Sequence, residues 1–207
     1  MSKKTISTEE KIKAAAIEVF TQKGYEATTT RDITDVAGLK NLASLHYYFK
    51  SKDQLFDVVI EHTMGNFSQL MDQILNNPTL ELHQKIRKFV PAYIDFIMAN
   101  PFLPMFILSE GEKNPQKMDY LMNDKQMLPS LSHQIQALVD DKIIRPTTIE
   151  HFISDLIGLT IFPFLSKSLM KLKTGLNEAG FLKMVEERKL HVPEMIIRSL
   201  YLKEPKG

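Results

Sequence analysis

The residues best suited to chemistry lie in one short stretch, in which His46-Tyr47-Tyr48 is followed by Lys50 and Lys52. An imidazole, two phenols and two ammonium groups so close together can donate hydrogen bonds and supply positive charge. Both properties suit the phosphate backbone of a nucleic acid. The stretch is therefore a candidate nucleic-acid contact. The alternative is that the two tyrosines pack against a neighbouring part of the protein.

Residue patterns typical of enzymes and metal sites are missing from the sequence. It has no phosphate-binding or dinucleotide-binding glycine motif, and neither HExxH nor GxSxG occurs. The six histidines form no i, i+4 pair, and the lack of cysteine excludes disulfides and thiolate metal sites. Asp140-Asp141 is more typical of a solvated helix end than of a catalytic pair. We therefore expect no enzymatic activity, no cofactor and no metal.

Composition and charge fit a globular chain with a basic N-terminal part. The 207 residues are 43% hydrophobic and carry a net charge of +1. Residues 1–52 contain nine Lys/Arg against six Asp/Glu, and the remainder contains 17 against 19. This asymmetry favours an anionic partner, although chance scatter explains it as well. The first residues are polar and the longest apolar run, 156–165, is too short to span a membrane, so we expect a cytoplasmic protein without membrane contact.

Three short helices are predicted within residues 1–50. The first begins after Ser7, which has Glu10 three positions later in a capping-box pattern, and ends near Gly24. The second begins after Thr29 and ends at Gly38. Its expected inward residues are Ile33, Val36 and Ala37. Two short helices joined by a glycine-containing turn are typical of a helix-turn-helix.

The third helix, within residues 40–49, would be the reading helix of that motif. One side of a helical wheel is apolar and is expected to face the core; it holds Leu42, Leu45 and Phe49. The opposite side and its flanks hold Ala43, Ser44, His46 and Tyr47. Small residues on this side allow a helix to approach base edges in the major groove, and hydroxyl groups can donate to phosphates at its rims.

A long fourth helix is predicted from Ser51 to about Leu75, because Ser51 and Gln54 repeat the capping pattern. Lys50 and Lys52 flank its start, where free N–H groups and the helix dipole also attract a phosphate. The phenols and lysines would then clamp the phosphates on either side of the reading helix.

The rest of the chain is also expected to be helical, at about 79–99, 101–110, 117–123, 125–141, 147–173 and 178–202. No segment alternates with the period of a strand. The predicted fold is therefore all-α. An N-terminal three-helix helix-turn-helix domain, residues 1–50, is joined through the long fourth helix to a C-terminal helical domain, residues 51–207.

The stretch "TTTRDITDVAGLKNLASLHYYFKSKDQLF", preceded by "AAAIEVFTQKGYEAT", resembles the DNA-binding domain of the TetR (tetracycline repressor) family of bacterial regulators over about residues 8–60. Beyond that region such proteins diverge, and the resemblance is one of layout. The turn has one residue more than the common pattern, at about Lys40. This leaves the residues that face bases open by one position.

The resemblance implies DNA contacts residue by residue. At the start of the second helix, Thr30 and Arg31 match positions that meet a phosphate and a base, respectively. Two matched positions face bases, namely Leu42 and Ala43. Four matched positions contact phosphates, namely Ser44, Tyr47, Tyr48 and Lys52. The helical wheel agrees for Ala43, Ser44 and Tyr47 but places Leu42 inward.

The resemblance also implies a small-molecule pocket and a dimer interface in the C-terminal helices. Aromatic and methionine side chains adapt to apolar ligands. The candidate lining residues are Phe89, Tyr93, Phe96, Phe102, Met105, Phe106, Met122 and Met127. The plainer interpretation of each is ordinary core. The candidate dimer residues are Phe152, Leu156, Leu159, Phe162, Met195 and Leu200. Within residues 151–171, Gly158 allows close approach and Pro163 predicts a kink; alternatively this is the core helix of a monomer.

The predicted function is a homodimeric, ligand-responsive transcription regulator, most simply a repressor. It would leave a roughly palindromic operator in double-stranded DNA when a small apolar or amphipathic molecule binds. The alternative from another class is a helical small-molecule carrier or enzyme whose N-terminal helices are only structural. An activator or a nucleoid-associated protein would share the same motif.

Overall fold

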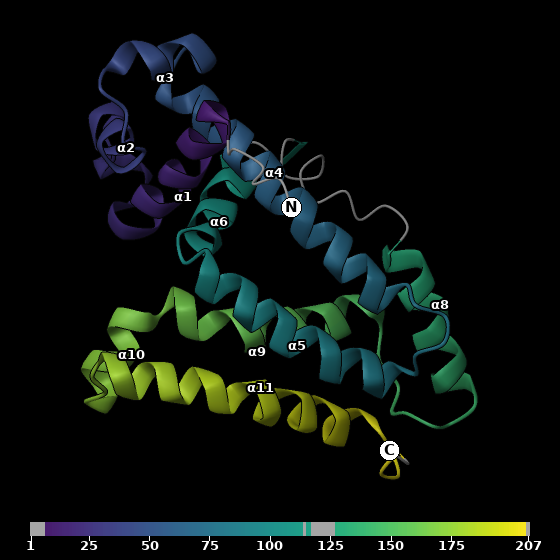
Figure 1. Cartoon of the computed structure of the whole chain (residues 1–207). Coiled ribbons are helices and arrows are strands. Elements are labelled where there is room, and N and C mark those ends of the chain that lie inside the picture. Colours follow the sequence, from purple (N-terminus) through teal and green to yellow (C-terminus); the bar gives the residue numbers. More distant parts are fainter. Residues whose placement is uncertain (1–6, 114, 117–126, 206–207) are drawn as a thin grey trace, which may run out of the picture.

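The computed structural model describes residues 7–113, 115–116 and 127–205, and these residues form ten helices and no strand (Figure 1). The N-terminal helices are α1 (Thr8–Ala27), α2 (Thr30–Val36), α3 (Leu42–Tyr48) and α4 (Lys52–Leu75). The later helices are α5 (Leu82–Ala99), α6 (Leu103–Lys113), α8 (Met127–Asp140), α9 (Ile149–Leu165), α10 (Lys167–Thr174) and α11 (Glu178–Leu200). The all-α fold is confirmed.

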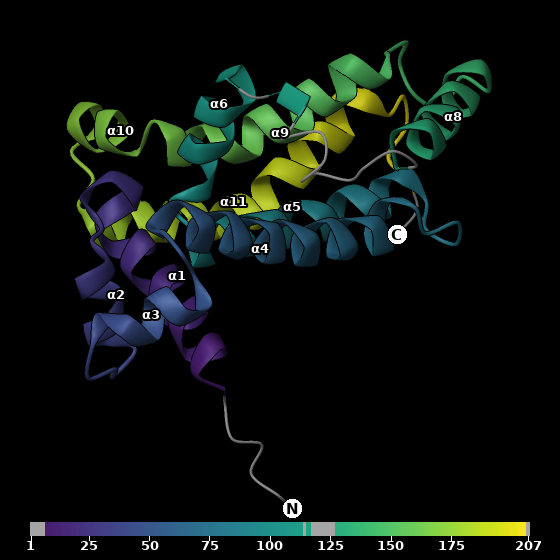
Figure 2. The ribbon, with the colours of Figure 1, turned by 90° about the horizontal axis from the view of Figure 1, so that it is seen from above.

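The arrangement places the short helices at one end of the molecule. Both views show α2 and α3 at the end opposite α8, with α4 leading from the short helices into the body (Figures 1 and 2). In the body, α5 packs against α4, α9 and α11. Among the described residues no single helix is both long and apolar enough to cross a membrane, although the bent pairs α5–α6 and α9–α10 reach that length and composition together.

Local capping explains where the N-terminal helices begin. The Ser7 hydroxyl accepts from the Glu10 N–H at 3.1 Å, and the Glu10 carboxylate accepts from the Ser7 N–H at 2.9 Å. Both bonds satisfy N–H groups that have no partner within a helix. At the other end, Gly24 has a φ of 76° inside α1, so the regular helix stops there and one further turn runs to Ala27.

Two hydrophobic clusters form the interior. The N-terminal cluster joins α1–α3 with the first half of α4, including Phe20, Leu45 and Phe56, and it also takes Leu103 from α6. The body cluster joins the later helices with the second half of α4. The N-terminal core therefore extends past residue 50, and α4 belongs to both cores.

The predicted helix over residues 147–173 is two helices. α9 ends at Leu165, and α10 starts at Lys167 at an angle of 71°. The break follows Ser166 rather than Pro163, at which a kink was expected. Proline has no N–H, so the Leu159 carbonyl four residues earlier lacks its helical donor. The Arg188 guanidinium of α11 donates to that carbonyl instead, and α9 continues past the proline.

Candidate nucleic-acid interface

The turn between α2 and α3 is closed by backbone hydrogen bonds around a glycine. Gly38 has a φ of 67°, a conformation that side-chain-bearing residues rarely adopt. The Gly38 N–H donates to the Asp35 carbonyl at 3.1 Å, and the Leu39 N–H donates to the Thr34 carbonyl at 2.9 Å. These bonds satisfy the end of α2 and direct the chain into α3.

The reading helix α3 starts at Leu42 because Asn41 caps it. The Asn41 carboxamide oxygen accepts from the Ser44 N–H at 3.2 Å and from the Ser44 hydroxyl at 3.3 Å. Asparagine directly before an apolar run is a recognised start signal for a helix, so Asn41 is the sequence signal that locates the start of α3. The additional residue near Lys40 thus lies in the turn, ahead of the cap.

The helical wheel of α3 is right for two core positions and wrong for the third. Leu45 and Phe49 are buried in the N-terminal cluster, as expected. Leu42 is not inward, because 36% of its surface is exposed. It is the first residue of a seven-residue helix, and a wheel assumes packed neighbours along the whole length, which the first turn lacks.

The same end effect explains a second correction, in α2. Val36 was expected to face the core, but it is the last residue of α2 and is 46% exposed. Thr34 is buried in its place, because its hydroxyl donates to the Arg31 carbonyl at 2.9 Å and so satisfies its polar group.

The outward face of α3 is open to solvent. Tyr47 is 83% exposed, and its ring meets the Tyr48 ring edge to face with centroids 5.0 Å apart. Neither tyrosine is buried by another part of the chain. Among the other candidate DNA-contacting residues, four have exposed side chains, namely Arg31, Ala43, His46 and Lys50. Thr30 and Ser44 are half-buried. These residues are brought together at one end of the molecule.

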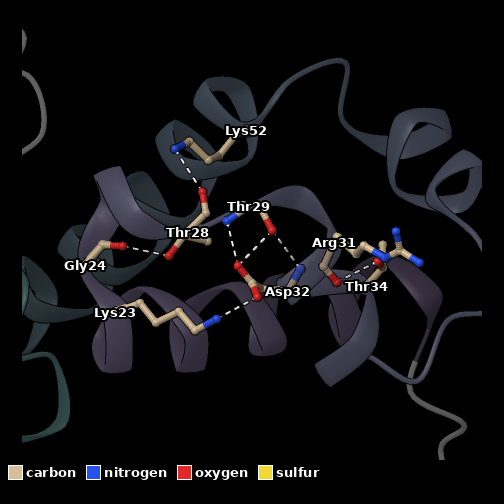
Figure 3. A network of polar contacts seen from close by, with 8 residues as sticks. All are labelled: Lys23, Gly24, Thr28, Thr29, Arg31, Asp32, Thr34 and Lys52. Atoms are coloured by element: carbon tan, nitrogen blue, oxygen red, sulfur yellow. Dashed lines mark hydrogen bonds and ion pairs between the residues drawn. The ribbon is translucent and has the colours of Figure 1, made fainter.

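Lys52 holds two helices together. Its ammonium donates to the Thr28 carbonyl at 3.0 Å (Figure 3). It also donates to the Tyr25 carbonyl at 3.0 Å and lies 4.2 Å from the centroid of the Tyr25 ring. The Tyr25 hydroxyl in turn donates to the Asp53 carboxylate. Two of the three ammonium donors are thus used within the protein, and one is left for a phosphate.

A second polar network fixes the start of α2. The Asp32 carboxylate accepts from the Thr29 N–H at 2.9 Å and from the Lys23 ammonium at 2.6 Å (Figure 3). The Lys23 hydrogen bond, followed by the Thr29 backbone bond, lowers the pKa of Asp32 to about 2. Arg31 lies beside this network with its guanidinium pointing away from Asp32 (Figure 3). The backbone that carries Arg31 is therefore held while its charge stays available.

The comparisons with known proteins match this end of the chain. Residues 12–59 match the family model described as bacterial regulatory proteins, tetR family. Over these residues the chain is similar to the N-terminal domain of the tetR family. YttP of Bacillus subtilis, described as a probable HTH-type transcriptional regulator, is 25% identical over 163 residues, 77% of this chain and 78% of that protein. Residues 12–59, which the family model matches, contain the capped α2, the turn, α3 and the start of α4.

Two further comparisons show how far along the chain the likeness to known regulators extends. The transcriptional repressor KstR2 of Mycolicibacterium smegmatis is 33% identical over 78 residues, 38% of each chain. The solved structure of FadR from Bacillus subtilis in complex with stearoyl-CoA has a TM-score of 0.61 and is 15% identical, covering 91% of this chain and 97% of that one. The fold is thus shared along nearly the whole chain.

The predicted ligand-lining residues are divided between the two cores. Phe89 and Tyr93 lie in the body cluster, and burial raises the pKa of Tyr93 to about 12. Phe102 and Phe106 instead pack on the N-terminal cluster, with Phe106 edge to face on Phe56 at 4.8 Å. Phe96 touches both clusters, and Met105 is 59% exposed. Met122 lies outside the described residues, and Met127 is the first residue of α8.

The predicted dimer residues are also divided. Phe152, Leu156 and Leu200 are buried in the core of their own chain, so they are removed from the proposed interface. Their positions follow the inward stripe of α9 and α11, which the sequence did not distinguish from an outward stripe. Leu159 is half-buried, whereas Phe162 and Met195 are exposed. Further exposed apolar residues on α10 and α11 are Leu169, Leu172, Leu182 and Leu190.

Proposed function

We propose that the chain is a homodimeric repressor that binds a roughly palindromic operator and leaves it when a small apolar or amphipathic molecule binds. The observation that carries this proposal is the arrangement of α3, which buries Leu45 and Phe49 and presents Ala43 and Tyr47 to solvent. A helix so placed can enter a major groove while its inner face stays packed. Residues 1–50, completed by the first half of α4, are the proposed DNA-binding unit.

The phosphate contacts are proposed for the rims of that helix. Tyr47 and Tyr48 can donate their hydroxyls to phosphates of one DNA strand, and Lys50 can place its ammonium beside a phosphate of that strand. At the start of α2, Thr30 would contact a phosphate and Arg31 would contact a base edge. Lys52 has a double role in this proposal, since the ammonium that holds α1 to α4 keeps one donor for a phosphate.

A homodimer is supported by the apolar surface of the last helices. Phe162 of α9 is 60% exposed and Leu190 of α11 is 77% exposed. A two-fold interface that covers both helices would remove this apolar surface from water. The dimer would set two α3 helices about 34–36 Å apart, one turn of B-DNA.

The effector is proposed to bind in the body, next to the helices that meet both cores. Phe67 of α4 stacks on Phe96 of α5 with centroids 4.1 Å apart, and Tyr93 lies beside the pair at 5.1 Å from Phe67. That the related FadR was solved with stearoyl-CoA supports a largely apolar effector. Such a molecule releases DNA only if it binds the DNA-free arrangement more tightly than the bound one.

Gel shift with the full chain and the DNA flanking its own gene tests the proposal. We expect a specific complex that weakens with salt, with a log–log slope reduced by about 0.9 per subunit in Lys50→Ala. Lys88→Ala, which removes an exposed lysine from α5, is the matched control and should leave the slope unchanged. A carrier or enzyme with merely structural N-terminal helices would give no specific complex.

The sign and the inducibility of regulation need a second measurement. A reporter gene behind the bound promoter is expected to be silent when the protein is present and active when an inducer is added. In vitro, operator affinity should fall as the inducer is titrated. A reporter that needs the protein for expression would identify an activator, and constant affinity across a broad panel of apolar compounds would remove the ligand-responsive part.

A further inference from the structure

The exposed large apolar residues of the N-terminal region are concentrated at the reading end. Within described residues 7–50 they are Val36, Leu42, Tyr47 and Tyr48. All four lie on α3 or on the last residue of α2, and the 20-residue helix α1 has none. Apolar side chains that gather on one exposed surface favour a surface that meets a partner.

The first turn of α3 has few groups that can read bases through hydrogen bonds. An asparagine reads adenine by using its amide oxygen and its amide nitrogen together. The Asn41 oxygen is already occupied by the Ser44 N–H and hydroxyl. Ser44 is itself half-buried and donates to Asn41. The free side chains of this turn are therefore Leu42 and Ala43, and both are apolar.

The apolar group that DNA presents in the major groove is the C5-methyl of thymine. We propose that Leu42 and Ala43 read thymine methyl groups in each half-site of the operator. The contact selects A·T pairs by apolar burial rather than by hydrogen bonding. Arg31 of α2 and His46 of the second turn of α3 supply the polar part of the readout. This inference rests on the proposed DNA binding and adds the class of base that the first turn of α3 recognises.

Deoxyuridine substitution isolates the methyl group, because uracil keeps every hydrogen-bonding group of thymine. The bound operator is first delimited by footprinting with the full chain. Each thymine of a half-site is then replaced by deoxyuridine, at both symmetric positions. We expect one or two positions at which affinity falls by about fourfold per half-site, the effect of burying one methyl-sized group. Replacement at thymines outside these positions should have no effect.

Variants assign the effect to residues. Leu42→Ala and Ala43→Gly are each expected to bind the thymine and uracil duplexes equally at the position that the residue reads. Tyr47→Phe is the matched control on the same helix; it should weaken both duplexes while preserving their ratio. Because only 36% of the Leu42 surface is exposed, binding of Leu42→Ala and of the unaltered protein is compared at a temperature at which thermal unfolding shows both proteins to be folded. Replacing the same thymine by cytosine also removes the methyl group and should lower affinity. Replacing it by 5-methylcytosine should recover part of the affinity that cytosine loses.

The outcomes separate the inference from the function on which it rests. If the full chain forms no specific complex with any promoter DNA, the proposed function fails. If a specific complex forms and is indifferent to every uracil replacement, DNA binding stands and the methyl readout is overturned. If the uracil effect persists in both Leu42→Ala and Ala43→Gly, other residues read the methyl group and the assignment is overturned.

Discussion

The polar contacts within the N-terminal region and those within the body differ in how far apart along the chain their partners lie. In the N-terminal region the helix starts are fixed by side chains three residues away, as in Ser7–Glu10 and Thr29–Asp32. In the body, helices far apart in the chain are joined by ion pairs such as Arg87–Glu194, at 2.7 Å between Nε and Oε1. These local contacts, together with the Lys52 ammonium on the Tyr25 and Thr28 carbonyls, hold a small domain with one open face. The long-range contacts hold a larger core in which most apolar faces are covered.

The two regions are nevertheless joined through shared elements. α4 supplies both cores. α6 brings Leu103 and Phe106 to the N-terminal cluster, together with Phe102 directly before it. The position of the reading helix therefore depends on residues far from DNA. This comparison can be tested by substitutions that act on one core, on the junction or on a single charge.

The largest effect is expected in the body core. Phe152→Ala should lower the free energy of unfolding by about 3–5 kcal/mol, because the ring of Phe152 is fully buried and leaves a cavity. Phe162→Ala on the same helix is the matched control; it should change unfolding little at low protein concentration and weaken the dimer. Urea denaturation and sedimentation measure the two effects. Equal losses of stability in both variants would contradict the assignment of faces.

A smaller effect, about 2–4 kcal/mol, is expected for Leu103→Ala at the junction. Leu103 belongs to α6 but is buried in the N-terminal cluster. Loss of the Leu103 side chain should destabilise the N-terminal cluster that supports α3 and so lower operator affinity, although Leu103 is buried and does not contact DNA itself. Met105→Ala, an exposed position on the same helix, serves as the control. Unchanged DNA binding in Leu103→Ala at temperatures where it is folded would show that the two regions are independent.

A modest gain of stability is expected for Lys85→Met. Lys85 is buried in α5, and burial lowers the pKa of its ammonium. In the pH window between that lowered pKa and 10.5 the unfolded chain holds the proton more tightly, so the unaltered protein gains stability as pH rises. The advantage of Lys85→Met, on the order of 1 kcal/mol at neutral pH, should therefore shrink in that window. Lys88→Met is the matched control, because Lys88 is an exposed lysine on the same helix.

The smallest effect is expected from a single surface carboxylate. The folded pKa of Asp32 is about 2, below the ordinary value of 3.8. Its contribution to stability is therefore present above about pH 4 and is lost as pH falls through 2. Asp32→Asn should lack this step in a thermal-unfolding series between pH 5 and 2. A step of equal size in both proteins would mean that another carboxylate causes it.

The sequence predicted the N-terminal region well because its signals are local. Capping residues and glycines mark the ends of α1, α2 and α4, and helical spacing identifies Leu45 and Phe49 as core. The misassigned residues, Val36 and Leu42, lie at helix ends. There the number of packed neighbours depends on how the helices meet, and spacing carries no information on that.

The body was predicted as helical, but its faces were not. α9 is apolar nearly all round, so the wheel could not separate the inward Phe152 and Leu156 from the outward Phe162. The packing of Phe102 and Phe106 on the N-terminal cluster depends on contacts with residues about 50 positions away, such as Phe56. Such contacts follow from the tertiary fold and leave no trace in local spacing.

The contact between Arg188 and the Leu159 carbonyl makes a helix-breaking residue an attachment point. A change of Pro163 to alanine restores an N–H that shares the same oxygen with the half-buried guanidinium. Removal of Arg188 alone leaves the carbonyl without any donor. Pro163 and Arg188 are thus coupled through one carbonyl oxygen.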